Sequence, residues 1–561
     1  MVRGLLVSFS GYPWTPTSLM PDNGLAALAG SLMAAGHEVK ILDYGTTALV
    51  KRLVPKDLQK GLRKAYAALS SGSSWPRKAL SLCRLARFEK ILGRKMEEES
   101  WRIAEEVSGL IEKEQVGFVG FKLWVGDGLA PSIAIAEEVK RRYPRMKMYG
   151  GGPLIDVVKE TLFRRTKVFD ALAFAEGEET ILGLAEHAAG KRDLNGIPNL
   201  VFRDGSRIER TPTRRVKDLN SLPSPVYDPE IYPSLRGDGK IKVFVVEESR
   251  GCPNCCAFCP HIEKTGRQRR EKRPDRILSE IQGLGQVGSR AFRYGGGNPP
   301  FNLLKRIAEG LLSSGMDVIY TSFGHVCEID CAMLSTLRDS GLFALNFGIE
   351  SGDDRILRDV MLKGHGVGEI RGALRASMGA GIYTVGSVIH PAPFETEESK
   401  VNTLNLLLDL FVGNRGSVQV FFPGLYPVSG WGREPEKFGF RVMDPGRYVE
   451  EHMDYQYRRL FPPRMWKPLP YTVNGKPFRK FIAETEWLVR ELETHGISTN
   501  ISDETALMSH LYDSSLPPVE FRDLCREVFF SGDWERMEEI VGRINEAVKA
   551  RTSQWVKCAS G

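Results

Sequence analysis

The sequence predicts an α/β protein built from two sheet-based parts and a mainly helical third part. Strand-like and helix-like segments alternate through residues 1–210, which is typical of a doubly wound, Rossmann-like parallel sheet. They alternate again through residues 241–440, where six strand–helix units favour a partial (β/α)6 barrel. Residues 211–240 are rich in arginine, proline and turn formers and predict a linker, whereas residues 441–561 are mainly helical.

Length and composition exclude several classes of protein. The 561 residues include 77 basic and 70 acidic side chains, a net charge of +7, with 42% hydrophobic and 26% charged residues. These are ordinary values for a soluble globular protein, and no apolar run approaches the roughly 18 residues of a membrane-spanning helix. The first residues show no signal-peptide pattern. We therefore expect a cytoplasmic monomer of three domains and exclude collagen-like, disordered, membrane-spanning and disulfide-scaffold proteins.

In the first part, most strand-like runs lead directly into glycine, proline or serine. The expected strands are Gly4–Ser8, Glu38–Leu42, Val116–Phe121, Lys147–Tyr149 and Ala171–Phe174. The expected helices are Asn23–Ala35, Trp101–Glu114, Pro131–Arg142 and Glu178–Ala189. Glycines at the carboxyl ends of parallel strands let a ligand approach the backbone closely. Ordinary turn chemistry is the alternative explanation for any single one of these glycines.

A basic helical insertion interrupts this pattern at residues 51–100. Its residues 51–95 hold 13 Lys/Arg against two acidic residues, so this stretch alone (+11) exceeds the net charge of the whole chain. The pattern is amphipathic, with Trp75, Leu80, Leu85 and Phe88 as apolar members. Such a surface could steer an acidic partner. The favoured interpretation is a solvated helical insertion, and we do not expect a nucleic-acid partner.

The second part repeats strand and helix six times. The expected strands are Lys242–Val246, Ala291–Tyr294, Asp317–Thr321, Phe343–Gly348, Tyr383–Ile389 and Ser417–Phe422. The expected helices are Arg276–Leu284, Asn302–Leu312, Cys331–Asp339, Gly368–Gly379 and Thr396–Phe411. A (β/α) barrel places its functional site at the carboxyl ends of its strands, and polar residues gather there.

Four of the nine cysteines lie within eight residues, directly after the first barrel strand. An odd number of cysteines in an intracellular chain argues against a disulfide framework. A structural zinc site normally uses two separated ligand pairs, and no second CxxC pair exists. Cys252, Cys256 and Cys259 instead suit an iron–sulfur cluster with one open iron. Cys327 and Cys331 are expected to be ordinary buried residues.

The segment around these cysteines resembles the radical S-adenosylmethionine (SAM) superfamily. The resemblance begins with the CxxxCxxC loop Cys252–Cys259, which has an aromatic residue before its last cysteine. It continues with Tyr294–Asn298, similar to a glycine-rich methionine-binding motif, and with Asn346–Asp354, similar to the GIESG segment. Gly386 onward corresponds to the strand and helix that carry the GxPGET motif. These motifs cover about 200 residues in the expected order.

Residues 1–210 resemble the cobalamin-binding domain that often precedes this barrel. The matching segments are Leu25–Val39 with Asp43, Gly150–Pro153, Ala175–Thr180 and Asn199–Gly205. The chain has no DxHxxG motif, so no histidine is expected as the lower axial ligand of cobalt. A cobalamin-type domain that does not bind the cofactor is the alternative.

The two resemblances imply cofactors and the residues that contact them. Cys252, Cys256 and Cys259 would hold a 4Fe–4S cluster. The SAM-binding residues would be Phe258, Gly295, Gly296, Gly297, Asn298, Glu350 and Ser351. The cobalamin-binding residues would be Tyr12, Trp14, Leu123, Trp124, Gly126, Gly150, Gly151, Gly152, Pro153, Glu176 and Gly177. A flavodoxin or ferredoxin would supply electrons, and the cluster implies an anaerobic, reducing environment.

Two departures from the family pattern are candidates for substrate contacts. The GLPGET position holds Ile389–Thr396, which includes His390, and the next motif is replaced by Pro423–Trp431, which includes Tyr426. Either side chain could orient substrate at a strand end. A capped loop histidine is the favoured interpretation of His390. The basic run Lys264–Arg270 could receive an acidic group.

The resemblance implies a cobalamin-dependent radical SAM C-methyltransferase. The 5′-deoxyadenosyl radical would activate an unactivated carbon, and methylcobalamin would deliver the methyl group to a peptide or protein side chain, a natural product or a lipid. One alternative is a radical SAM enzyme with a cobalamin-type domain that catalyses cyclisation or C–C coupling. A second, from another class, is an iron–sulfur regulatory module without turnover.

Overall fold

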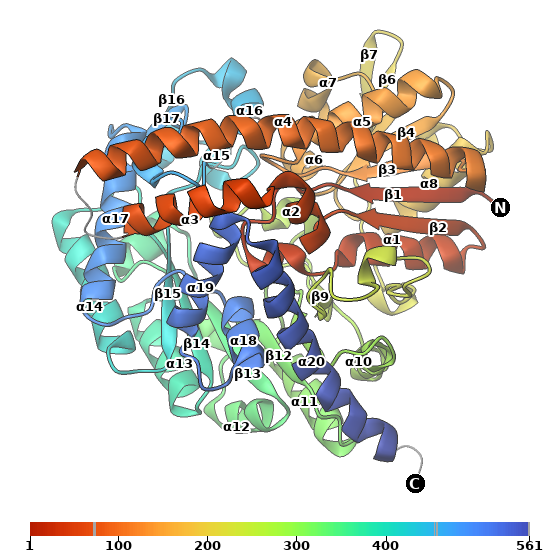
Figure 1. Ribbon diagram of the computed structural model, residues 1–561. Helices are drawn as coiled ribbons and strands as arrows, with labels where there is room; N and C mark the ends of the chain where they lie inside the picture. Colours follow the sequence, from red (N-terminus) through yellow and green to blue (C-terminus); the bar gives the residue numbers. More distant parts are fainter. Residues whose placement is uncertain (71–74, 454, 456–457, 559–561) are drawn as a thin grey trace.

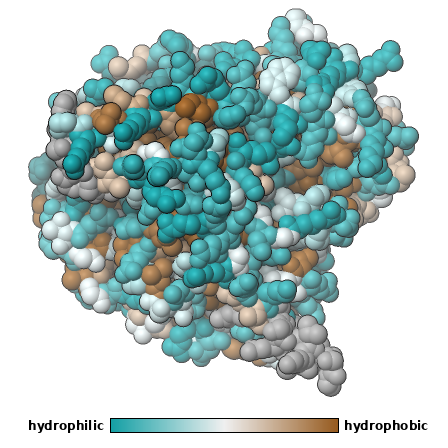
Figure 2. All heavy atoms as spheres, in the orientation of Figure 1, coloured by the Kyte–Doolittle hydropathy of each residue, from teal (hydrophilic) through white to brown (hydrophobic). Residues whose placement is uncertain are grey.

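A computed structural model describes residues 1–70, 75–453, 455 and 458–558 of the chain. Two parallel sheets lie side by side, and helices from the end of the chain reach both of them (Figure 1). None of the described helices combines the length and the apolar character that crossing a membrane would require. The face shown in Figure 2 is mainly hydrophilic, with its apolar side chains scattered among polar ones.

The N-terminal sheet confirms the five strands expected in the first part and adds a hairpin at one edge. Its strands are β1 (Arg3–Ser8), β2 (Glu38–Asp43), β3 (Phe118–Lys122), β4 (Lys147–Gly151), β5 (Ala171–Ala173), β6 (Leu200–Asp204) and β7 (Arg207–Arg210). Their order is β2-β1-β3-β4-β5-β6-β7, with β1 to β5 parallel and the β6–β7 hairpin antiparallel. The carboxyl ends of β1 to β5 therefore meet along one edge.

Helices cover both faces of this sheet, as a doubly wound fold requires. They are α1 (Asn23–Ala34), α5 (Leu129–Arg142), α6 (Pro153–Val158), α7 (Leu162–Arg165) and α8 (Glu178–Ala188). Alternate strand residues face opposite sides: Leu5 and Val7 pack in one core with α5 and the long helix α4 (Trp75–Glu114), and Leu6 packs in the other with α1 and α8. The Asp22 carboxylate caps α1 by accepting a hydrogen bond from the Leu25 N–H at 3.0 Å.

The basic insertion forms α2 (Thr47–Leu53), α3 (Lys56–Ser70) and α4 (Trp75–Glu114), the last a single helix of 40 residues. Leu85 and Phe88 are buried as expected. Leu80 is 53% exposed, so the prediction that it belongs to the buried apolar face is wrong. The Trp75 side chain lies outside the described part. The insertion is also less solvated than expected, because α3 packs against the C-terminal helix α19 (Pro518–Ser531).

The second sheet confirms the six expected barrel strands. They are β8 (Val243–Val246), β11 (Ala291–Tyr294), β12 (Ile319–Gly324), β13 (Leu342–Glu350), β14 (Tyr383–Ile389) and β15 (Gly416–Phe421). All are parallel and follow one another in chain order without closing, so the barrel is partial. The outer helices are α10 (Pro274–Gln286), α11 (Phe301–Ser313), α12 (Cys331–Asp339), α13 (Val367–Gly379) and α14 (Glu397–Phe411).

Residues after the barrel are mainly helical, as expected, with one short hairpin, β16 (Phe440–Val442) and β17 (Tyr471–Val473). The helices are α15 (Gly430–Arg433), α16 (Pro445–Met453), α17 (Phe478–Thr494), α18 (Asp503–Tyr512), α19 (Pro518–Ser531) and α20 (Trp534–Cys558). Helix α18 packs against β12, β13 and β14. Its fully buried Asp503 accepts hydrogen bonds from Arg293, Thr321 and Asn346 on three barrel strands.

Candidate functional site

The cysteine loop lies between β9 (Ser249–Arg250) and β10 (Arg270–Glu271), which pair as a two-stranded ribbon at its base. Gly251 opens the loop with φ +88°, and an added Cβ would lie 2.0 Å from the Gln268 carbonyl oxygen, so the turn requires glycine. The Cys252 N–H donates to the Gly266 carbonyl at 3.1 Å, which closes the other end of the loop. The backbone therefore holds the loop before any ligand binds.

Three of the four loop cysteines, Cys252, Cys256 and Cys259, are partly buried. The pKa of Cys256 is raised to about 11, mainly by burial, with an opposing contribution from Lys363 and smaller increases from Glu350, Cys259 and Cys252. Burial likewise raises the pKa of Cys259. A metal ion bound by these thiols would replace their protons. Cys255 is exposed instead, and its Sγ accepts a hydrogen bond from Arg267. The geometry therefore separates Cys252, Cys256 and Cys259 from the fourth loop cysteine.

A buried ion pair faces these thiols. Lys363 Nζ lies 3.1 Å from Glu350 Oε1, and both side chains are less than one-tenth exposed. Glu350 follows a register shift in β13 and has φ +64°. Lys363 also interacts electrostatically with Cys256 and Cys259, and its ammonium lies 5.7 Å from the centre of the Phe258 ring. Sequence reasoning missed Lys363 because no local pattern marks it.

The glycine-rich segment after β11 is packed closely against the end of β8. The Gly296 N–H donates to Glu248 Oε2 at 3.1 Å, and an added Cβ there would lie 2.0 Å from Glu248 Oε1. A Cβ on Gly297 would lie 2.5 Å from His261 Nε2. Asn298 is 5% exposed, yet neither polar atom of its side chain has a partner among the described residues. A buried, unsatisfied amide beside exposed backbone suits a polar ligand.

The Ser351 side chain makes its contacts within the protein. It is 1% exposed, its Oγ accepts from the Asp353 N–H at 3.2 Å, and it lies 3.4 Å from Thr403 Oγ1. These contacts fix the turn after β13. The contacts of Ser351 within the described chain therefore account for its polar atom without a ligand.

Two adjoining cavities lie at the carboxyl edge of the N-terminal sheet. One, of about 460 Å³, is lined by Tyr12, Trp14, Trp124 and Gly126 and reaches Val245 on β8. The other, of about 210 Å³, is lined by the remaining expected residues of this edge: Gly150, Gly151, Gly152, Pro153, Glu176 and Gly177. Asn23 and Lys122 line both cavities. Together the two cavities form a long recess that ends beside the barrel.

Leu123 lines neither cavity. It is fully buried in the core, and its N–H donates to the Gly151 carbonyl at 2.8 Å. Side chains alternate along an extended strand end. The neighbouring Trp124 therefore faces the recess, where its indole N–H donates to Ser8 Oγ at 3.1 Å.

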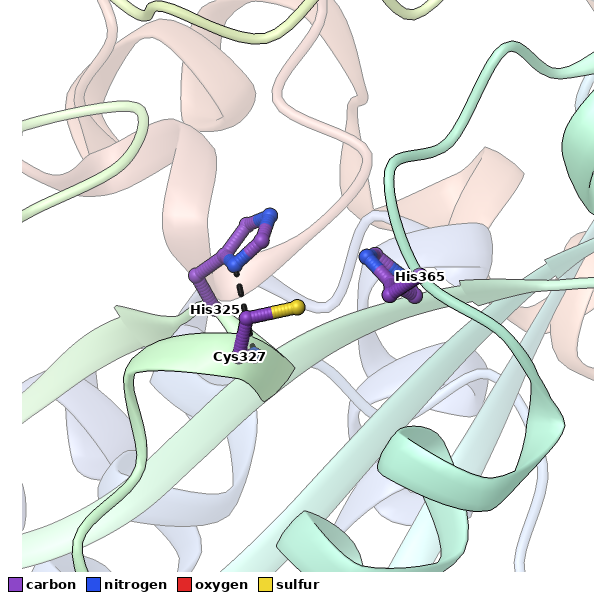
Figure 3. Close-up of side chains that lie close together, drawn as sticks. All are labelled: His325, Cys327 and His365. Carbon is purple, nitrogen blue, oxygen red and sulfur yellow. Dashed lines mark hydrogen bonds between the residues drawn. The ribbon is translucent and has the colours of Figure 1, made fainter.

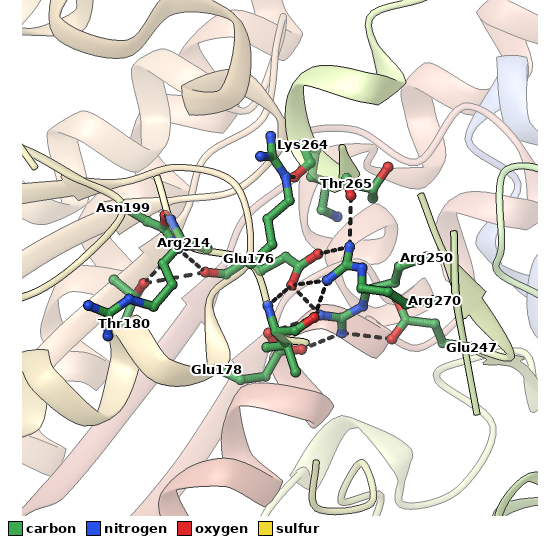
Figure 4. Close-up of polar contacts among 12 residues, drawn as sticks. Glu176, Glu178, Thr180, Asn199, Arg214, Glu247, Arg250, Lys264, Thr265 and Arg270 are labelled. Carbon is green, nitrogen blue, oxygen red and sulfur yellow. Dashed lines mark hydrogen bonds and ion pairs between the residues drawn. The ribbon is translucent and has the colours of Figure 1, made fainter. Parts of the chain in front are cut away.

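Glu176 connects the N-terminal sheet to the cysteine loop (Figure 4). It is 4% exposed and accepts hydrogen bonds from both terminal nitrogens of Arg270, at 2.6 and 3.0 Å, and from the Val216 N–H at 2.7 Å. Arg250, beside it, pairs with Glu178 and with Glu247. Arg250 and Arg270 pair across the base of the cysteine loop. The contacts of the Glu176 carboxylate are therefore mainly to this loop base.

The cysteine loop, the glycine-rich segment and the Glu350 strand fall within one family match. Residues 246–407 match the family model of the radical SAM superfamily. The chain contains a radical SAM domain.

Proteins similar to this chain extend the likeness beyond the radical SAM domain. An uncharacterized methyltransferase of Pyrococcus horikoshii is 25% identical over 53% of this chain and 65% of its own length. The cobalamin-dependent radical SAM methyltransferase TokK of Streptomyces tokunonensis is 24% identical over 62% of this chain and 52% of its own. This chain thus spans about half to two thirds of those relatives.

A solved structure shares the fold of nearly the whole chain. It is the radical SAM methyltransferase TsrM of Kitasatospora setae with cobalamin and a 4Fe–4S cluster bound. The TM-score is 0.61 at 16% identity, with 98% of this chain and 100% of TsrM covered. At that identity the likeness shows the fold alone.

The two substrate candidates beside the radical SAM domain lie in different surroundings. Tyr426 is 38% exposed, and burial together with the nearby Cys259 thiol raises its pKa. His390 is 1% exposed, with Nδ1 3.1 Å from Glu395 and its ring 5.8 Å from Trp487 on α17. Neither ring nitrogen has a hydrogen-bond partner among the described residues, so the capped-histidine interpretation stays a prediction.

One cysteine expectation is wrong. Cys327 and Cys331 are both exposed, not buried. Cys331 is the first residue of α12, and Cys327 lies in a single 3₁₀ turn, so neither faces the core.

Proposed function

We propose that the protein is a cobalamin-dependent radical SAM methyltransferase that transfers a methyl group from SAM to an unactivated carbon. The observation that carries this proposal is that one chain combines two sites. One is the group of three loop cysteines in the radical SAM domain, and the other is the long recess at the edge of the N-terminal sheet that reaches β8. The names of TokK and TsrM, both methyltransferases, support the reaction class.

Residues of the radical SAM domain would hold the cluster and SAM. Cys252, Cys256 and Cys259 offer three partly buried thiols, which would leave one iron of a 4Fe–4S cluster open. The unpartnered Asn298 amide and the glycine-rich backbone before it would bind the polar groups of SAM. Phe258, between Lys363 and Trp431, would contact the adenine. When bound, these groups supply a 5′-deoxyadenosyl radical, and cobalamin supplies the methyl group.

The recess at the N-terminal sheet would hold cobalamin. Trp14 and Trp124 offer flat apolar surfaces, and their indole N–H groups already donate to Asp127 and Ser8. Gly150 to Gly152 allow close approach to the backbone. No histidine is among the lining residues of either cavity in the described chain, which supports a cobalt ion without a histidine ligand from the protein.

The substrate would enter through a third cavity, of about 410 Å³. It shares Tyr12, Trp14, Asp127 and Arg459 with the larger cofactor cavity. Leu92 and Met96 of α4 form an apolar part of its wall, and Glu97 adds a carboxylate. This placement supports a small molecule or a peptide side chain as the methyl acceptor, and makes the insertion part of the substrate site.

The first experiment is the absorption spectrum of anaerobically purified protein supplied with iron, sulfide and hydroxocobalamin. We expect both a cluster and a bound corrinoid. A cluster without corrinoid after this treatment would contradict methyl transfer through cobalamin. Cys256→Ala should abolish reductive cleavage of SAM, whereas Cys255→Ala, at the exposed thiol, should retain it. Equal cleavage in the two variants would refute the cluster assignment.

A further inference from the structure

A second group of metal-binding side chains lies at the ends of β12 and β13. His325 follows β12, and Cys327 belongs to the 3₁₀ helix Val326–Glu328 that His325 caps. His365 comes from the turn before α13. One potential ligand atom from each residue lies within 4.8 Å of the other two. In Figure 3 the Cys327 thiol points toward His365.

The imidazole of His365 lacks partners. The residue is 8% exposed, and neither ring nitrogen has a hydrogen-bond partner among the described residues. Its ring lies 5.2 Å from that of His325 in an edge-to-face arrangement. Among the described residues, the hydrogen bond to His325 Nδ1 is a long one, 3.4 Å from the Cys327 N–H, which a stronger ligand would readily displace. Buried polar atoms are normally satisfied, so these nitrogens point to a ligand.

The ligand types select the kind of ion. Two imidazoles and a thiolate suit zinc and neighbouring divalent transition metals, whereas calcium and magnesium prefer oxygen ligands. Ligand atoms around one zinc ion lie about 3.5 Å apart, so the group has to contract by roughly 1 Å. Rotation of the exposed Cys327 side chain can supply most of that closure. The carboxylates of Glu328 and Glu369 face Cys327 and offset the charge of Lys363.

We propose that His325, Cys327 and His365 form a second metal site, separate from the cysteine loop, that binds one zinc-class divalent ion. Three protein ligands leave a fourth position open to water or to a substrate oxygen or sulfur. The two helices that follow, α12 and α13, hold the ligand-bearing turns in place. The site does not depend on the proposed methyl transfer, because none of its ligands lines the cobalamin recess.

The test is zinc and iron content of the full-length, cluster-loaded protein after equilibrium dialysis against Zn²⁺. We expect about one zinc per chain in the wild type. Cys327→Ala and His365→Asn should each weaken zinc binding by roughly 100-fold, because each removes one of three ligands. Cys331→Ala is the matched control, since it removes another exposed thiol four residues away, and it should bind zinc like the wild type. Unchanged iron content in all variants shows that the fold and the cluster loop are intact.

Three results would overturn the proposal. The wild type takes up no zinc; Cys327→Ala and His365→Asn bind zinc as tightly as Cys331→Ala; or zinc is lost in Cys256→Ala and retained in His365→Asn, which would locate it on the cysteine loop. If His365→Asn also loses iron, His325→Asn replaces it as the second ligand variant. Failure of corrinoid binding or of SAM cleavage would leave these zinc measurements unaffected, so the two proposals fail separately.

Discussion

Lys363 is a buried cation whose ion-pair partner, Glu350, is buried as well. Removing one member of such a pair leaves the other charged group without compensation. We expect Lys363→Met to lower the free energy of unfolding by about 3 kcal/mol, measured by urea denaturation under anaerobic conditions. The double variant Lys363→Met/Glu350→Gln should recover part of that loss, because no charge is then left unpaired.

Lys305→Met is the matched control for this prediction. Lys305 lies 3.9 Å from Glu309 on the surface of α11, with both side chains more than one third exposed. Exposed pairs of this kind contribute about 0.5 kcal/mol or less. A Lys363→Met variant as stable as Lys305→Met would contradict the importance of the buried pair.

Asp156 on α6 gives a pH-dependent contribution to stability. Burial raises its pKa to about 6, partly offset by the attraction of Lys264, while its Oδ1 accepts from the Ala175 N–H at 2.6 Å. Between the ordinary pKa near 4 and pH 6, the folded chain holds a proton that the unfolded chain has released. Stability therefore falls as the pH rises through this window, by about 3 kcal/mol in total.

Asp156→Asn should remove this dependence. The amide oxygen still accepts from Ala175 but does not ionise, so the variant should exceed the wild type in stability by up to about 3 kcal/mol near pH 8, and by less near pH 5. Urea unfolding at several pH values measures the difference. An advantage that stays constant across this range would mean that Asp156 is not the titrating group.

The residues that could be predicted from sequence are those whose signal is local. Cys252, Cys256 and Cys259 fall within one short loop, so their spacing alone separates them from the other cysteines. Lys363 and the group His325, Cys327 and His365 carry no such spacing. Only the parallel pairing of β12 with β13 brings their strand ends together, and that pairing is a tertiary event.

At the level of elements, the ribbon β9–β10 is held to the N-terminal sheet by Glu176. Replacing this carboxylate by glutamine leaves Arg270 partly uncompensated in a buried position. We expect Glu176→Gln to lower the free energy of unfolding by about 3 kcal/mol and to reduce iron loading, because the base of the cysteine loop is loosened.

Glu179→Gln is the control. Glu179 lies three residues further along the chain, in the first turn of α8, and pairs with Arg214 on the surface. It should change stability by about 0.5 kcal/mol or less and leave iron content unaltered. Iron content and the urea midpoint of unfolding, measured for both variants, test this prediction. If the two variants behave alike, Glu176 serves the recess and not the loop.

The elements themselves follow closely from hydrophobic periodicity. All eleven expected strands are present, because each is a short apolar run ended by glycine or a polar turn. The predicted end of the basic insertion at residue 100 is not a boundary in the structure. The sequence predicts a basic insertion and then a separate helix from Trp101, but one helix runs through from residue 75 to 114. Leu85, Phe88, Leu92 and Met96 continue its buried face, and that continuity outweighs the change in charge.

At the scale of the whole molecule, the C-terminal helices join the other parts into one core. A single buried cluster includes Leu5 of β1, Val54 after α2, Ile319 of β12 and Phe529 of α19. Tyr12, beside the cofactor recess, donates its hydroxyl to the Phe529 carbonyl at 2.8 Å. Because unfolding of α19 and α20 would expose the core of the N-terminal sheet, we expect these parts to unfold together, in one calorimetric transition.

Gly532, between α19 and α20, tests this coupling. It has φ +66°, and an added Cβ would lie 2.7 Å from Val54 Cγ1, so Gly532→Ala combines backbone strain with a clash against the insertion. Gly496→Ala, with φ +76° and nothing within 4 Å of the added Cβ, carries the strain alone. We expect Gly532→Ala to cost about 2 kcal/mol and Gly496→Ala about 1 kcal/mol.

Hydrogen–deuterium exchange then shows how far the loss extends. In Gly532→Ala, amides of β1 and β3 should exchange faster along with those of α19, because all three share the buried cluster. Faster exchange confined to α19 and α20, with β1 unchanged, would show that the C-terminal helices unfold as a unit of their own. In the expected case, the C-terminal helices stabilise the wall of the cofactor recess at Tyr12, and a change far from the cysteine loop should weaken corrinoid retention before it affects the cluster.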